Sequence, residues 1–255
     1  MAAAKVNYST EKNVVYTPKN WPEEVRADVY QPVVEGVTPA VLLIHGGSWA
    51  QNDNRYQMRA IAKKLVRRGY LVVNATYRLA PKWHFPSPVE DLRQALCWMR
   101  DHAEQLNIDP HRVAVYGYSA GGHLAELVGF QPPPEGISIR AIVAGAAPHD
   151  LTLKPDFPVV SQFLGVSYTE NPEVYHQASP LNNVSSEMPA LFIYQGTKDK
   201  LVPPEHTYRL LPQLEKYDAR HQIHWVKGRG HISTFIFPRK AVRDAMIFLE
   251  KELTD

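Results

Sequence analysis

A serine stands between glycines in the stretch GYSAGG, residues 117–122. The apolar run Val113–Tyr118 before it is typical of a strand, and Ala120–Phe130 after it has a helical pattern. In a strand, sharp turn and helix of this kind, the glycines permit close backbone approach and the serine hydroxyl projects above the sheet. The N–H groups and dipole of the following helix favour an anion at the same place. The pattern therefore predicts that Ser119 is a nucleophile.

A serine hydroxyl needs a base to take its proton, and the base needs an acid to fix its tautomer. Each should lie at the carboxyl end of a strand, where open α/β sheets bind ligands. His231 meets this condition, because it follows the predicted strand His221–Val226 beside the glycines of KGRGH. For the acid, Asp199 in GTKDKLVP follows the predicted strand Ala190–Gln195. Asp150, which follows the predicted strand 140–147, is the rival candidate for the acid. Its structural interpretation is that it caps or forms hydrogen bonds at the end of that strand.

Most of the other histidines, of eleven in the chain, fit structural roles better than a catalytic one. His123 lies on the helix behind the serine, and two others belong to a predicted strand, His221 and His224. Four have polar helical or loop surroundings in the sequence: His102, His111, His176 and His206. His231 is therefore the predicted base.

Attack on an acyl carbon creates an oxyanion, which needs preorganised hydrogen-bond donors. The sequence HGGSW, residues 45–49, directly follows the predicted strand Ala40–Ile44. Gly46 and Gly47 can expose their amides with no Cβ in the way. Together with the N–H of Ala120, they are the predicted oxyanion hole.

Short apolar runs alternate with longer helical patterns, which favours a parallel sheet with helices on both faces. The predicted strands are 13–17, 25–31, 40–44, 70–77, 113–118, 140–147, 190–195 and 221–226. The predicted helices are 54–68, 88–106, 120–130, 205–217 and 241–252. The fold class is thus α/β, with about eight strands.

One interval, Leu151–Met188, interrupts this alternation. A structureless stretch of that length is uncommon in a compact domain. We predict a small cap-like insertion at residues 151–188 over the carboxyl edge of the sheet, within a single domain of residues 1–255.

Composition is ordinary for a soluble globular protein, with 44% hydrophobic and 21% charged residues among 255. The formal net charge is only +2 and the basic residues are dispersed, which argues against a nucleic-acid partner. The single cysteine, Cys97, excludes an internal disulfide framework. We expect no membrane span, because no stretch approaches about 18 apolar residues. The first twenty residues lack the apolar segment of a signal peptide, which favours a cytoplasmic location, although a removed signal would be compatible with export.

Six ordered motifs between Ala40 and His231 resemble the α/β-hydrolase fold, within the carboxylesterase branch related to hormone-sensitive lipase. The motifs are HGGSW, YRLAP, PVEDLRQAL, GYSAGGHLA, GTKDKLVP and GRGH. The resemblance implies an eight-stranded, mostly parallel sheet flanked by helices. It implies Ser119, Asp199 and His231 as the triad and Gly46, Gly47 and Ala120 as oxyanion donors. It implies no metal or organic cofactor, and homodimers are common in such families.

Two departures from that branch favour its compact members. Only 44 residues precede His45, so a long N-terminal cap has no room, and Tyr118 stands where the branch often has Asp before the serine. Both features are similar to compact bacterial feruloyl or acetyl-xylan type esterases and to kynurenine formamidases. Of the aromatic residues near these loops, Trp49 and Tyr118 are the best candidates for substrate binding.

The sequence thus predicts a serine carboxylesterase that hydrolyses short-chain or aromatic acyl esters of small molecules through an acyl-enzyme. An arylformamidase with the same triad is an open alternative, because esters and formamides pass through similar tetrahedral oxyanions. A ligand-binding protein without turnover is the alternative from another class. Such proteins usually lack a triad member, whereas all three are present here.

Overall fold

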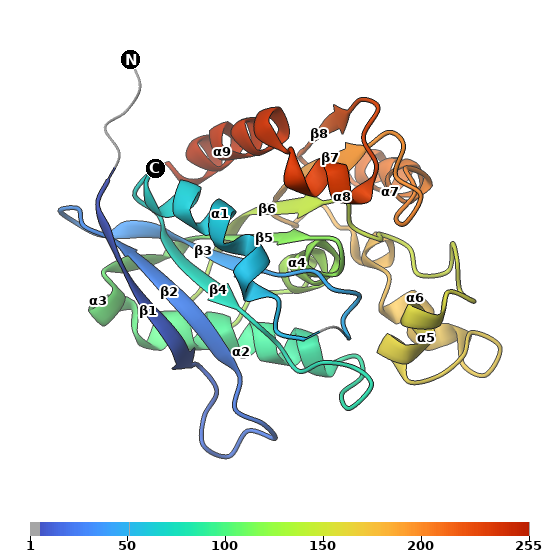
Figure 1. The fold of residues 1–255 in the computed structure, drawn as a ribbon, viewed down its shortest axis with the longest axis horizontal. Helices are drawn as coiled ribbons and strands as arrows, with labels where there is room; N and C mark the ends of the chain where they lie inside the picture. The colour runs from blue at the N-terminus through green and yellow to red at the C-terminus, as the bar shows by residue number, and fades with distance from the viewer. Residues whose placement is uncertain (1–5, 51, 255) are drawn as a thin grey trace.

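The computed structural model describes residues 6–50 and 52–254, in which a central sheet lies between two layers of helices (Figure 1). Over these residues the sheet has eight strands in the order β1-β2-β4-β3-β5-β6-β7-β8. β2 pairs antiparallel with both β1 and β4, and the later strand pairs are parallel. The predicted eight-stranded, mostly parallel sheet is confirmed. Residues 1–5, 51 and 255 of the predicted domain lie outside the described residues.

The strands are β1 Tyr8–Val15, β2 Arg26–Pro32, β3 Thr38–Ile44, β4 Leu71–Ala75, β5 Ile108–Tyr118, β6 Ile139–Gly145, β7 Ala190–Gly196 and β8 His221–Val226. The helices are α1 Arg55–Val66, α2 Ser87–Asp101, α3 Ala103–Leu106, α4 Ala120–Phe130, α5 Pro158–Leu164, α6 Pro172–Gln177, the 3₁₀ helix η1 Pro180–Asn183, α7 Glu205–Lys216, α8 His231–Ile236 and α9 Arg239–Leu253. In the described part of the chain, no helix combines the length and apolar character needed to cross a membrane.

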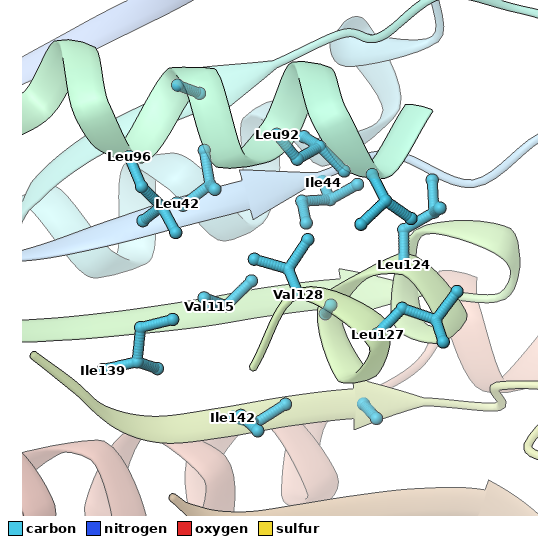
Figure 2. Close-up of a cluster of buried hydrophobic side chains, with 14 of the residues drawn as sticks. Leu42, Ile44, Leu92, Leu96, Val115, Leu124, Leu127, Val128, Ile139 and Ile142 are labelled. Carbon is cyan, nitrogen blue, oxygen red and sulfur yellow. The ribbon is translucent and has the colours of Figure 1, made fainter. Parts of the chain in front are cut away.

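The apolar core consists of two layers, because side chains of a strand point alternately to the two faces of a sheet. Leu42 and Ile44 of β3 contribute to the layer beneath α2 and α4, which Figure 2 shows with Leu92 and Leu124 pointing into it. The next residues along β3, Val41 and Leu43, contribute to the layer beneath α1 and α9. Burial on both faces explains why the central strands read as continuous apolar runs.

The strand order creates a crevice at the carboxyl edge of the sheet. From β3 the chain crosses to β4 on one side, and from β4 it crosses back to β5 on the other side of β3. Ligands of open α/β sheets bind at such a reversal of strand order. The loop after β3 and the turn after β5 meet there, and these are the HGGSW and GYSAGG motifs.

The interval predicted as a cap-like insertion, residues 151–188, contains α5, α6 and η1. Figure 1 shows α5 and α6 in yellow, past the carboxyl ends of the central strands. Its buried side chains include Val160, Phe163 and Tyr175, all part of the core layer that also contains α2 and α4. We call residues 151–188 the cap segment.

Candidate active site

Ser119 occupies the turn between β5 and α4 with φ +56° and ψ −125°. Such a conformation is uncommon for a non-glycine residue and persists where neighbours enforce it. The Ser119 N–H donates to the carbonyl of Gly145 at 2.7 Å. A Cβ at Gly117 would lie 2.0 Å from the carbonyl oxygen of Gly121, so glycine is needed for this close approach. The surrounding backbone thus enforces the turn and presents the serine side chain at the crevice.

Three predicted residues meet in one hydrogen-bonded chain. Ser119 Oγ donates to His231 Nε2 at 2.9 Å, and His231 Nδ1 donates to Asp199 Oδ2 at 2.7 Å. The other carboxylate oxygen accepts the backbone N–H groups of Leu201 and Val202 at 3.0 and 2.9 Å. Asp199 is buried and both of its oxygens have partners, so its position beside the imidazole is fixed. An acceptor on Nδ1 leaves Nε2 free to take the serine proton.

Asp150 lies apart from this chain. Its Oδ1 accepts the N–H and hydroxyl of Thr152 at 2.8 and 2.7 Å, and its Oδ2 accepts Arg209 Nη1 at 2.7 Å. These contacts match the structural interpretation of Asp150, while the hydrogen bond to His231 comes from Asp199. The geometry thus favours Asp199 over its rival as the acid.

The residues predicted as oxyanion donors lie beside the serine. A Cβ at Gly46 would lie 2.8 Å from the carbonyl oxygen of Tyr118 and 3.2 Å from Ser119 Cβ, so only glycine lets this loop pack against the nucleophile. Gly47 has φ +117°, a conformation that favours glycine. Ala120 is the first residue of α4, where backbone N–H groups have no partner within the helix.

His45 holds the HGGSW loop, a role that the sequence did not reveal. Its Nδ1 donates to the carbonyl of Gly46 at 2.7 Å, and its Nε2 accepts the Thr76 hydroxyl at 2.9 Å. The ring stacks on Tyr77 at 4.7 Å between centroids. Complete burial lowers the pKa of His45 to about 4, so the ring is neutral near pH 7.

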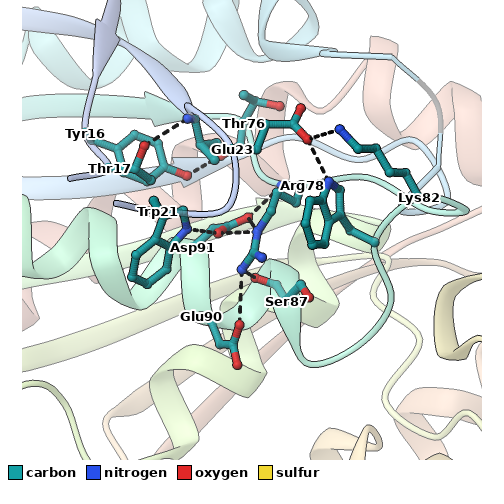
Figure 3. A network of polar contacts seen from close by, with 12 residues as sticks. Tyr16, Thr17, Trp21, Glu23, Thr76, Arg78, Lys82, Ser87, Glu90 and Asp91 are labelled. Atoms are coloured by element: carbon teal, nitrogen blue, oxygen red, sulfur yellow. Dashed lines mark hydrogen bonds and ion pairs between the residues drawn. The ribbon is translucent and has the colours of Figure 1, made fainter. Parts of the chain in front are cut away.

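A buried ion pair between Arg78 and Asp91 holds the YRLAP motif (Figure 3). The motif in turn contacts the HGGSW loop. Arg78 Nε donates to both oxygens of Asp91 at 2.8 and 3.0 Å, and Trp21 Nε1 donates to Asp91 at 2.7 Å. Two residues on, the N–H of Ala80 donates to the carbonyl of Trp49 at 3.0 Å. Satisfied buried pairs of this type fix geometry more than they add stability. The motif therefore supports the backbone of Trp49.

His123 joins the HGGSW loop to the cap segment. Trp49 Nε1 donates to His123 Nδ1 at 3.2 Å, and His123 Nε2 donates to the carbonyl of Ala178 at 2.7 Å. The Trp49 ring also stacks on Phe163 at 4.6 Å between centroids. Burial lowers the pKa of His123 to about 3, the nearby His149 adding to the effect and the Ala178 contact opposing it.

This low pKa predicts that His123 contributes to acid sensitivity. Between about pH 6.5 and 3 the unfolded chain binds a proton at this position and the folded chain does not, so stability falls as pH falls. We expect His123→Gln to reduce the slope of unfolding free energy against pH by nearly one proton, about 1.4 kcal/mol per pH unit. Urea unfolding of the wild type and of His123→Gln at pH 4.5 and 5.5 measures this slope. Equal slopes would contradict the prediction.

In the described residues, two hollows border Ser119. The cap-side pocket is lined by residues that include Trp49, Ala120, Leu151, Val160 and His206. The helix-side pocket is lined by residues that include Gly46, Gly47, Tyr118, His231 and Phe235. The two residues predicted to bind substrate thus lie in different pockets.

Tyr118 contacts the base as well as the helix-side pocket. Its hydroxyl donates to the backbone carbonyl of His231 at 2.7 Å, and the two ring centroids are 5.2 Å apart. Burial raises the pKa of Tyr118, and the charge of Asp199 adds to the rise, so the phenol remains a hydrogen-bond donor near pH 7. Tyr118 thereby holds the start of α8, which carries His231.

His206 differs from its sequence-based assignment. The sequence placed it in polar helical or loop surroundings, but it is buried at the start of α7 and lines the cap-side pocket. A signal for this burial was present in the sequence, because His206, Leu210 and Leu214 recur at intervals of four and form the buried stripe of α7. The burial comes from the segment after β6, whose residue Asp150 donates its N–H to His206 Nδ1 at 3.4 Å.

The packing of the serine turn predicts that Gly121 is indispensable for stability. A Cβ there would lie 2.3 Å from the carbonyl oxygen of Ile44 and 2.5 Å from that of His45, both backbone atoms that cannot move aside freely. We expect Gly121→Ala to lower Tm by about 10 °C or more, or to prevent folding. Gly230→Ala is the control, because its Cβ would meet only the Lys198 carbonyl at an ordinary 3.4 Å. Equal decreases in Tm for Gly121→Ala and Gly230→Ala would contradict this prediction.

Among the described residues, no three His, Cys, Asp or Glu side chains are grouped so as to hold a metal ion.

The family model BD-FAE matches residues 27–214. Esterase LipQ of Mycobacterium tuberculosis is 31% identical over 182 residues, which are 65% of this chain and 43% of LipQ. LipM, a probable carboxylic ester hydrolase of the same organism, is 30% identical over 71% of this chain and 46% of its own length. The chain thus spans less than half of these two relatives.

Solved structures share the whole fold. A truncated carbohydrate esterase from gut microbiota superposes with a TM-score of 0.87 at 22% identity, covering 100% of this chain and 99% of its own. A bacterial heroin esterase has a TM-score of 0.83 at 26% identity, covering 98% of this chain and 86% of its own. These similarities confirm the α/β-hydrolase fold.

Proposed function

Because this chain belongs to the BD-FAE family of α/β hydrolases, we propose that it is a serine carboxylesterase acting on short-chain or aromatic acyl esters. The observation that supports this most directly is the hydrogen-bonded chain from Ser119 through His231 to Asp199, at the crevice where Gly46 packs against the serine. The names of its relatives LipQ and LipM, an esterase and a probable carboxylic ester hydrolase, point to the same reaction class.

Acylation begins when His231 Nε2 takes the proton of Ser119 Oγ and that oxygen attacks the ester carbonyl. The oxyanion is held by the N–H groups of Gly46, Gly47 and Ala120. His231, now charged and facing the carboxylate of Asp199, gives its proton to the leaving alcohol. The tetrahedral intermediate collapses to an acyl-serine and free alcohol.

Deacylation repeats these steps with water as the nucleophile. His231 takes a proton from water, and the hydroxide adds to the acyl carbon. The same three N–H groups hold the second oxyanion. Collapse returns the proton from His231 to Ser119 Oγ and releases the carboxylic acid. No other group is needed to balance these steps.

The acyl preference follows from the small cap. The cap-side pocket is bordered by the apolar side chains of Trp49, Leu151 and Val160, which suit a short alkyl or aromatic group. The partner we propose is accordingly a small-molecule ester. Trp49 would contact it on the cap side and Tyr118 on the helix side.

A fluorophosphonate probe tests the nucleophile and parallel assays test the reaction. We expect one adduct per chain by intact mass, located on the Ser119 peptide, and turnover of p-nitrophenyl acetate to octanoate that is fastest with short chains. N-formylkynurenine, assayed alongside, distinguishes an arylformamidase: faster turnover of that substrate would replace the esterase proposal. An unlabelled Ser119 with no turnover of either substrate would favour a ligand-binding protein.

A further inference from the structure

His206 contributes a polar group to a pocket wall that is otherwise mainly apolar. The side chain belongs to α7, and the residue is only 5% exposed. Its ring borders the cap-side pocket together with Leu151 and Val160. The catalytic steps above do not use it. Buried polar side chains normally have hydrogen-bond partners, so the presence of this histidine in the pocket wall requires an explanation.

The contacts of His206 fix which ring nitrogen carries the proton. The backbone N–H of Asp150 points at Nδ1 from 3.4 Å, and because an N–H only donates, Nδ1 is the acceptor. Burial lowers the pKa of His206 to about 3, with His149, Lys154 and Arg209 adding to the effect and Asp150 opposing it. The ring is therefore neutral in any ordinary assay, with its single proton on Nε2.

This Nε2–H has no hydrogen-bond partner among the residues that the structure describes. The wall contains other polar groups, of which the Ser48 hydroxyl is half-buried and borders both pockets. Asp150 accepts bonds from Thr152 and Arg209, and Trp49 donates to His123. Lys154 is exposed and belongs to the rim. His206, only 5% exposed, thus presents a ring N–H at this pocket that no described residue accepts.

The mechanism determines which half of the ester reaches His206. His231 must give its proton to the leaving oxygen, so the alcohol leaves on the side that His231 borders, the helix-side pocket. The cap-side pocket includes Ser119 and Ala120 but not His231. It therefore takes the acyl group, which remains on the serine after the alcohol has left.

We propose that His206 is a specificity-determining residue whose Nε2–H selects acyl groups that carry an oxygen acceptor, such as alkoxy, hydroxy or oxo acyl groups. A hydrocarbon acyl group of the same shape would leave this buried donor unpaired, and sites with such donors discriminate against analogues that lack the acceptor. The inference rests on the proposed esterase function and adds the substrate class of its acyl pocket.

The test compares matched p-nitrophenyl esters that differ by one oxygen in the acyl chain. The pairs are methoxyacetate with butanoate, 3-methoxypropanoate with pentanoate and 4-oxopentanoate with 4-methylpentanoate. Because the oxygen also changes intrinsic reactivity, the quantity to compare is the ratio of kcat/KM within a pair, in wild type and in His206→Phe. For at least one pair, we expect this ratio to fall about 3- to 10-fold in the variant. Unchanged ratios for all pairs, with the hydrocarbon esters still hydrolysed, would overturn the proposal.

Two controls separate selection from a general packing effect. His206→Gln keeps a side-chain N–H near the position of Nε2, and we expect it to retain most of the wild-type ratio. With acetate as the acyl group and the oxygen moved to the alcohol, as in 4-methoxyphenyl against 4-ethylphenyl acetate, His206→Phe should not change the ratio. A change confined to the alcohol series would show that the two pockets have the opposite roles, and would overturn the proposal.

A measurement on a protein with an intact His206 keeps the inference testable even if both variants misfold. In Ser119→Ala protein, ¹⁵N NMR of the imidazole should show His206 with its proton on Nε2, and the Nε2 signal should move when 3-methoxypropanoate ester is added but not with pentanoate ester. Equal response to the two esters would overturn the inference. Failure of the wild-type protein to hydrolyse any of the esters would instead contradict the proposed function.

Discussion

Ser119→Ala is expected to lower kcat for p-nitrophenyl acetate by about 10⁴- to 10⁶-fold, with the protein still folded. The variant has no hydroxyl for His231 to activate, so neither acyl transfer nor labelling by a fluorophosphonate has a nucleophile. What remains is the binding and oxyanion contribution, which in serine hydrolases is worth about 10³ to 10⁴ over water. Steady-state kinetics with thermal unfolding measures both parts of the prediction.

Ser48→Ala is the matched control, because Ser48 borders both pockets beside Ser119. It should change kcat only a few-fold and leave the adduct on Ser119. If Ser48→Ala abolished labelling and Ser119→Ala did not, the nucleophile would be Ser48 and the mechanism would have to be rewritten.

Asp199→Asn should lower kcat by about 10⁴-fold while leaving the fold intact. The amide oxygen can still accept the N–H groups of Leu201 and Val202, so the loop after β7 keeps its conformation. The amide nitrogen would then face His231 Nδ1 as a donor, which moves the imidazole proton to Nε2. A proton on Nε2 prevents the ring from accepting that of Ser119.

Asp150→Asn provides the comparison between the two acids of the sequence prediction. It weakens an ion pair with Arg209, a half-exposed side chain, and leaves the environment of His231 unchanged. We expect a change in kcat of less than about tenfold. A greater loss in Asp150→Asn than in Asp199→Asn would reverse the assignment of the acid.

The sequence predicted the central elements well because local and tertiary preferences agree there. α4 and β8 have the predicted bounds, and β7 extends the prediction by one residue. β1 begins at Tyr8 rather than near Asn13, because this edge strand is polar, largely exposed and interrupted by an irregular register between Glu11 and Val14. The predicted helix 88–106 is divided into α2 and α3 at His102.

The candidate site residues were likewise predictable where the local sequence marks their position. Ser119, Asp199 and His231 are each marked by a glycine or turn next to a strand, and the structure brings them together; their catalytic roles remain predictions. The supporting histidines could not be found this way. His45 and His206 acquire their roles from Thr76 and Asp150, which are distant in sequence. α8 was not predicted because its six residues are too few for a helical period to emerge.

The cap segment leaves the sheet between two strands and lines the cap-side pocket with residues that include Leu151 and Val160. The segment leaves the sheet after β6 and returns at β7, and these strands pair directly, with Ala141 opposite Ala190. Substitutions at Leu151 or Val160 can therefore alter the wall that we propose to face the acid half of an ester while β6 and β7 stay paired. Replacement of the whole segment would also remove Phe163 and Ala178, which contact Trp49 and His123. If the proposed pocket roles hold, variants changed only at the residues that line the pocket should differ in the acid they release and share the alcohols they accept.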